Sequence, residues 1–166
     1  LNIFINDEIL IEALGKIVFK DMQWEKILTL IRKRICNEFI FNKKTFDDSK
    51  LKLTIALAEQ CFINEYVYDI SESEKDSIDK IIKICIDGVL NETTVSLISC
   101  YFPLYKFIEH IPSLNSFSST NKSFNELLKL QLLEPLEEIN LSKKIKTLGY
   151  INDTVSKKVK SQYEEN

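Results

Sequence analysis

The residue types that most often carry chemistry are few in this chain, and their spacing does not group them. His110 is the only histidine, and it precedes Ile111 and Pro112, a setting more typical of a polar helix cap than of a catalytic base. The four cysteines lie far apart and no two of them stand in the CxxC spacing typical of zinc sites, which favours buried thiols over a zinc site or a disulfide framework. We therefore predict no metal site and expect reduced, buried thiols at Cys36, Cys61, Cys85 and Cys100.

Phosphate-binding and nucleotide-binding loops need clustered glycines, because backbone N–H groups must approach the ligand closely. The chain has three glycines, Gly15, Gly88 and Gly149, and no two of them are near one another. The Rossmann fingerprint, the P-loop and the glycine-rich loop of methyltransferases are therefore missing from these residues. We predict that the chain alone has no catalytic or cofactor-binding residues and is not an enzyme.

The densest mixture of polar and aromatic side chains lies between Glu59 and Tyr68. On a helix, Cys61 and Glu65 would be neighbours at i and i+4, and so would Asn64 and Tyr68. One interpretation is a recognition face for a partner, and the other is a polar helix side that closes a gap between helices. The sequence leaves both open. The residues assigned here to partner contacts are Gln60, Asn64, Glu65 and Tyr66.

The net charge argues against nucleic acid as a partner, and the length of the apolar runs argues against a membrane. A net charge of -3 and a pI near 5.4 argue against a nucleic-acid binder, which needs a basic stripe. No run approaches the ~18 apolar residues of a transmembrane helix, so we expect no membrane association and a cytoplasmic location. The three consecutive cations Arg32, Lys33 and Arg34 are predicted to lie on a solvated helix face.

Apolar residues recur with a helical period through most of the chain, and strand-like alternation is weak. This pattern predicts an all-α fold of six or seven helices packed as antiparallel hairpins, as a helical bundle or a short array resembling tetratricopeptide repeats. The 34-residue repeat pattern itself does not follow Trp24. The expected apolar stripes lie within residues 9–18, 24–39, 51–67, 78–89, 92–102, 124–133 and 155–163.

Local signals predict where several helices begin and end. Ser71 and Glu74 form an S-x-x-E capping box, which predicts the start of a helix at this point. Pro103 and Pro135 should each stop or kink a helix, because proline lacks the N–H and its ring clashes with the preceding turn. The polar stretch 111–122 is predicted to be a mobile loop.

Four segments resemble motifs of bacterial tetratricopeptide-repeat methyltransferases, and they follow one another in the same order. Residues 55–67 (IALAEQCFINEYV) are similar to A-L-A-x-Q-C-F-x-N-E-Y-V, and residues 100–104 (CYFPL) to C-Y-x-P-L. Residues 133–137 (LEPLE) resemble E-P-L-E, and residues 153–166 (DTVSKKVKSQYEEN) resemble D-x-V-S-x-x-V-x-x-Q-Y-E-E-N. The resemblance covers about residues 51–166, whereas the opening helices match only loosely.

The resemblance implies a helical region that precedes a class I S-adenosylmethionine-dependent methyltransferase domain. Residues 1–152 would form a single all-helical domain, and residues 153–166 a junction segment leading to a catalytic domain outside this chain. S-adenosylmethionine is then the cofactor of the parent protein and not of this chain. Tyr163 and Glu164 match the junction motif and would pack on the catalytic domain.

The function that follows from the resemblance is a non-catalytic scaffold in a bacterial cytoplasm. It would position the methyltransferase domain of the same polypeptide or bind a protein substrate. Two alternatives belong to other classes: a stand-alone helical oligomerisation or adaptor module, and a small-molecule-binding helical domain that uses residues 60–66.

Overall fold

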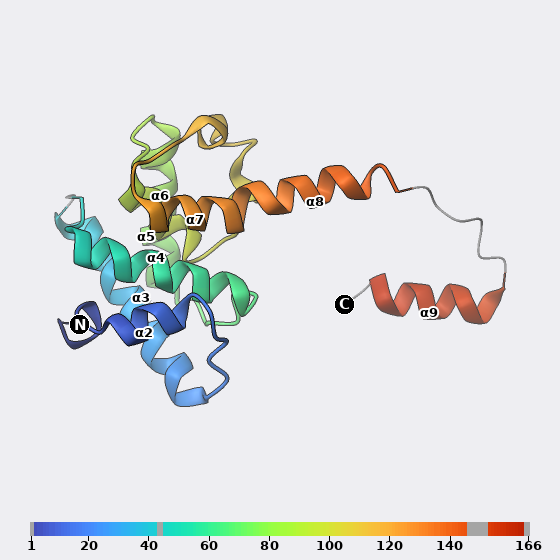
Figure 1. Ribbon diagram of the computed structural model, residues 1–166, viewed down its shortest axis with the longest axis horizontal. Helices are drawn as coiled ribbons and strands as arrows, with labels where there is room; N and C mark the ends of the chain where they lie inside the picture. The colour runs from blue at the N-terminus through green and yellow to red at the C-terminus, as the bar shows by residue number, and fades with distance from the viewer. Residues whose placement is uncertain (1, 43–44, 146–152, 165–166) are drawn as a thin grey trace. The chain divides into compact units, whose positions relative to one another are not determined.

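The computed structural model describes residues 2–42, 45–145 and 153–164, and all secondary structure in these ranges is helical (Figure 1). This confirms the predicted all-α fold. Contacts divide the chain into two units, residues 1–136 and residues 137–166. The division falls earlier in the chain than the boundary predicted after residue 152, which itself lies outside the described residues.

The helices begin and end as follows. The elements of the first unit include α1 (Asn2–Ile5), α2 (Glu8–Leu14), α3 (Met22–Asn42), α4 (Asp48–Ile63), α5 (Glu72–Ile86), α6 (Glu92–Ser99) and α7 (Lys122–Leu128), with 3-10 turns at Leu104–Phe107 and Pro112–Ser116. A π-helical turn (Lys129–Leu133) connects α7 to α8 (Glu134–Ser142), and α9 (Thr154–Glu164) follows in the second unit. The described residues thus hold more helical segments than the six or seven predicted. None of these helices combines the length and apolar composition needed to cross a membrane.

The structure adds detail to two expectations about the connections. The stretch predicted as a polar loop contains the 3-10 turn Pro112–Ser116, which is anchored because Leu114 is buried in the core. Pro135 does not stop the helical run. It follows directly on the π-helical turn, where the ordinary i→i−4 hydrogen-bond ladder is already interrupted, so its missing N–H removes little.

Side-chain caps set the starts of three helices, and the sequence predicted the one at Ser71. The capping box at α5 is present, since the amide N–H of Ser71 donates to Glu74 Oε2 at 3.0 Å. Asp47 caps α4, where its carboxylate accepts from the Lys50 N–H at 2.9 Å. Asn91 caps α6 in a second reciprocal box with Thr94.

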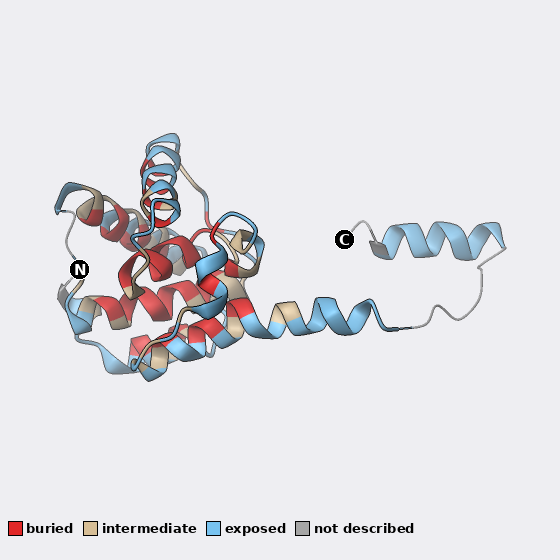
Figure 2. Cartoon of the chain, turned by 90° about the horizontal axis from the view of Figure 1, so that it is seen from above, coloured by how far each residue is buried: buried red, intermediate tan, exposed pale blue. Residues whose placement is uncertain are grey.

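Helix α4 is the centre of the first unit and lies between α2 and α7 (Figure 1). It also contacts α1, α3 and α6, so most of its residues are buried (Figure 2). The sequence predicted one apolar stripe running through residue 67. The structure instead buries several sides of this helix, and Val67, beyond its end, is 61% exposed.

Arg32 contradicts the prediction of a solvated cationic face on α3. Its side chain is 1% exposed, whereas Arg34 lies in solvent. Arg32 Nη2 lies 3.4 Å from Glu74 Oε1 and donates to the Asp69 carbonyl at 2.5 Å. The guanidinium also lies over the ring of Tyr101, 4.4 Å from its centroid. These contacts offset the cost of removing the cation from water.

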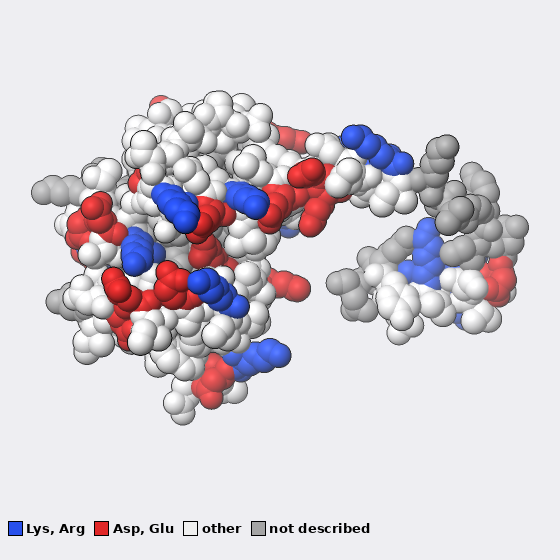
Figure 3. All heavy atoms as spheres, in the orientation of Figure 1, with Lys and Arg blue, Asp and Glu red and all other residues white. Residues whose placement is uncertain are grey.

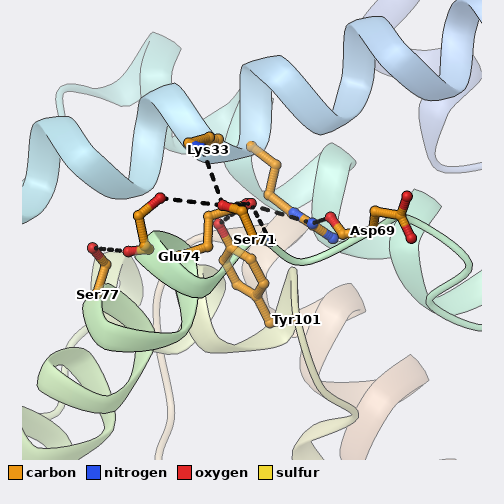
Figure 4. A network of polar contacts seen from close by, with 8 residues as sticks. Lys33, Asp69, Ser71, Glu74, Ser77 and Tyr101 are labelled. Carbon is orange, nitrogen blue, oxygen red and sulfur yellow. Dashed lines mark hydrogen bonds and ion pairs between the residues drawn. The ribbon is translucent and has the colours of Figure 1, made fainter.

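Glu74 joins three parts of the structure through one carboxylate (Figure 4). Oε1 faces Arg32 of α3 and accepts from the Tyr101 hydroxyl at 3.2 Å. Oε2 accepts from both the N–H and the hydroxyl of Ser71, at 3.0 and 2.9 Å, and so caps α5. Burial raises the pKa of Tyr101, which keeps its phenol protonated as a donor.

We predict that Glu74→Gln lowers the free energy of unfolding by about 3–5 kcal/mol, because it leaves a buried guanidinium without its counter-charge. Glu72→Gln is the matched control: it removes a carboxylate from the same first helical turn, but Glu72 is exposed and pairs with Lys75 at the surface. That change should cost less than ~0.5 kcal/mol. Urea unfolding measures both, and equal losses would contradict a special role for the buried pair.

Candidate functional site

Residues 59–68, for which a recognition face was one of the two interpretations, include the end of α4 and the turn that follows it. Glu65 and Tyr66 both have φ of 59°, in the left-handed region that side chains other than glycine rarely adopt. The turn is closed by hydrogen bonds from the Tyr66 N–H to the Cys61 carbonyl (2.8 Å) and from the Glu65 N–H to the Phe62 carbonyl (3.0 Å). The helix predicted to continue through residue 67 therefore stops at Ile63.

The turn carries the Tyr66 side chain back between α4, α6 and the π-helical turn. Its hydroxyl lies within hydrogen-bond distance of the Gln131 amide oxygen (3.0 Å) and the Ser99 carbonyl (3.2 Å). Gln131 donates in turn to the carbonyls of Ala58 (2.9 Å) and Ser99 (3.2 Å). Tyr66 and Gln131 thus satisfy each other in the interior and connect three elements.

Sequence reasoning missed Gln131, although a signal was present. It follows Phe124, Leu127 and Leu128 at the i+7 position of a buried helical stripe. A single amide on an otherwise apolar helix face needs partners inside the fold.

Gln60 binds buried backbone groups, and Asn64 bonds to a neighbouring tyrosine. Gln60 is fully buried at 0% exposure, so it offers no surface to a partner in this structure. With its amide oriented so that donor meets acceptor, it donates to the carbonyls of Leu14 (3.2 Å) and Ile17 (2.8 Å) where α2 ends. Asn64, oriented by the same criterion, accepts from the Tyr68 hydroxyl at 2.7 Å.

The predicted contact residues therefore separate into two groups. Gln60 and Tyr66 close gaps between helices, as the second interpretation of this segment proposed. Glu65 is exposed, so its carboxylate does not close such a gap. Partner contacts by Glu65 and Asn64 stay predictions.

The four cysteines are free and buried, as predicted. Burial raises the pKa of Cys61 to about 12, although Arg32 lowers it, and raises the pKa of Cys36 to about 11. Both thiols stay protonated near neutral pH and are poor nucleophiles. His110 is exposed, and the described residues contain no group of three or more His, Cys, Asp or Glu that could hold a metal ion.

Helix α9 presents a second candidate surface. Val155, Val159 and Tyr163 recur every four residues and are 69%, 45% and 83% exposed. Asp153 caps this helix by accepting from the N–H groups of Val155 and Ser156, both at 2.9 Å. A hydrogen bond with the Ser156 side chain, together with these two backbone hydrogen bonds, holds the pKa of Asp153 below its usual value. All the described side chains of α9 are exposed (Figure 2).

The residues of the predicted junction motif are described only in part. Tyr163 lies on the exposed apolar stripe, and Glu164 is the last residue of α9. The final two residues of the motif, 165 and 166, lie outside the described residues.

Comparisons with protein-family models, with curated proteins and with solved structures give no match for this chain. The similarity to methyltransferase-associated regions therefore rests on the four sequence motifs alone.

We predict that Tyr66→Phe lowers the free energy of unfolding by about 1–3 kcal/mol, because the buried amide oxygen of Gln131 loses its donor. Tyr105→Phe is the control, since Tyr105 is also half-buried and its hydroxyl makes no hydrogen bond within the described part of the chain. Thermal and urea unfolding measure the difference. A loss no larger than that of the control would show that the Tyr66 hydroxyl has no structural role.

We also predict that Glu65→Gly stabilises the protein by about 0.5–1 kcal/mol, because glycine adopts a positive φ without the steric cost that a Cβ brings. Glu65→Ala removes the same exposed carboxylate but keeps the Cβ, so it should give no gain. If both variants unfold at the same urea concentration, the left-handed conformation stores no strain at this position.

Proposed function

We propose that this chain is a non-catalytic helical module of a larger S-adenosylmethionine-dependent methyltransferase, in which it positions the catalytic domain of the same polypeptide. The observation that carries the proposal is the exposed apolar stripe of α9, formed by Val155, Val159 and Tyr163. The stripe lies in the segment whose sequence resembles the junction motif of that family.

The length and composition of α9 favour docking on another surface. The helix has 11 residues, and isolated helices shorter than ~12–15 residues are marginal in water. A neighbour that covered the apolar stripe would supply the missing stability, at about 1.5–3 kcal/mol for each fully buried large aliphatic side chain. Tyr163 suits such a junction, because its ring can pack while its hydroxyl reaches a polar partner.

The first unit has the continuous, well-packed core that a scaffold needs. Its core is continuous from α2 to the π-helical turn, and the buried contacts of Tyr66 and Gln131 fix the α4 end of that core. A scaffold needs such a rigid unit and a separate docking element, and this chain has a candidate for each. A protein substrate is a second partner that the same surface could accept.

The coding sequence that follows Asn166 tests the assignment directly. We expect it to encode a class I methyltransferase domain with a glycine-rich loop. A stop codon, or an unrelated domain, would contradict the proposal.

We further predict that Val159→Asp, made in the full polypeptide, lowers methyl transfer at least tenfold without changing the melting temperature of residues 1–166 expressed alone. Lys157→Asp introduces the same side chain at another exposed position of α9, outside the apolar stripe, and should leave activity within about twofold. If both variants lose activity equally, the stripe is not the docking element. Concentration-dependent dimerisation that Val159→Asp abolishes would support the self-associating alternative instead.

A further inference from the structure

A depression of about 170 Å³ opens between α2, α4 and α7, in the first unit and away from the turn at Tyr66. Figure 3 shows acidic and basic side chains gathered over the face that these helices form. The apolar part of the lining comes from Ile11, Ile55 and Ala56, all of them largely buried. The charged part consists of three carboxylates and two lysines: Glu12, Glu59, Glu126, Lys16 and Lys52.

All but one of these charges have a partner. Lys16 pairs with Glu12 at 2.7 Å, and Lys52 lies 4.0 Å from Glu8. Glu126 lies 3.9 Å from Lys122. Within the described residues, Glu59 alone among the charged residues of the depression has neither an ion pair nor a hydrogen bond.

Gly15 makes room for this unpaired carboxylate. A Cβ added at Gly15 would lie 2.3 Å from Glu59 Oε2, which is closer than real Cβ contacts come. The φ of Gly15 is −82°, so the backbone conformation does not itself demand glycine. The absence of a side chain at the end of α2 therefore lets Glu59 lie against the backbone at the wall of the depression.

The surroundings of Glu59 favour a cation beside it. Burial and the carboxylates of Glu126 and Glu12 raise its pKa to about 7, against a smaller opposing effect of Lys16. Lys52, which also faces the depression from α4, is drawn toward Glu8. A bound cation would neutralise Glu59 and relieve its repulsion with both carboxylates.

We propose that this depression binds a small organic cation, whose ammonium group pairs with Glu59 while its short carbon chain packs on Ile11, Ile55 and Ala56. The volume suits such a ligand, since a cavity of ~150 Å³ holds a molecule the size of benzene. A bare metal ion fits less well, because among the described residues no three acidic or other metal-binding side chains, the three carboxylates of the depression included, are placed so that they could hold one ion together. The proposed site uses residues of the first unit alone and does not rest on the proposed scaffold function.

The direct test is an NMR titration of the chain with n-butylammonium chloride at pH 8, with n-butanol and butyrate as neutral and anionic probes. We expect saturable shifts at the amides of Gly15, Glu59 and Ser123 with Kd in the millimolar range, on the order expected for so few ligand atoms. Neither control probe should saturate. Near neutral pH, binding should release protons, because the raised pKa of Glu59 leaves part of its carboxyl groups protonated before the cation binds.

Three variants separate the site from general charge effects. Glu59→Gln should weaken binding at least tenfold, and Gly15→Ala should weaken it by displacing the carboxylate without disturbing the fold, since only a flexible side-chain end must move. Glu109→Gln removes an exposed carboxylate elsewhere and should leave Kd within twofold. Equal binding by Glu59→Gln, equal binding of butyrate, or no saturation at ~100 mM n-butylammonium would each overturn the proposal.

Discussion

A guanidinium in the interior of a small helical protein constrains everything around it, because a desolvated charge must be neutralised and hydrogen-bonded where it stands. Arg32 pairs with Glu74, donates to the Asp69 carbonyl and lies over the ring of Tyr101. The partners come from α5, from the segment before it and from the turn that follows α6. The position of α3 against this half of the fold is thereby fixed by charge as well as by shape, although Nε and Nη1 of Arg32 have no hydrogen-bond partner within the described residues.

Local features of the fold could be predicted from the sequence, and those that depend on distant residues could not. The capping box at Ser71 needs only Glu74, three residues away, so the sequence alone is enough to predict it. The burial of Arg32 depends on Glu74, which is 42 residues away, and a triplet of cations gives no sign of it. The left-handed turn at Glu65 and Tyr66 was hidden for the same reason, since the Tyr66 hydroxyl bonds to residues of α6 and the π-helical turn.

The candidate sites show that polar residues expected at a recognition surface can instead form hydrogen bonds inside the fold. Gln60 and Tyr66 looked like recognition residues because they are polar and aromatic, and the structure uses that polarity to satisfy buried carbonyls and amides. Glu59 begins the same polar segment of the sequence and was assigned no role there, yet it is the unpaired carboxylate of the depression. In α9 the periodicity of Val155, Val159 and Tyr163 was visible from the sequence, and the structure adds that the stripe is exposed.

Hydrogen–deuterium exchange gives the most direct test of the account, in which a stable helical unit presents α9 to a catalytic domain. The chain alone should be compared with the full polypeptide. We expect the α4 amides to be equally protected in both and the α9 amides to exchange fast in the isolated chain but slowly in the full protein. Equal protection of α9 in the two samples would contradict the proposed docking.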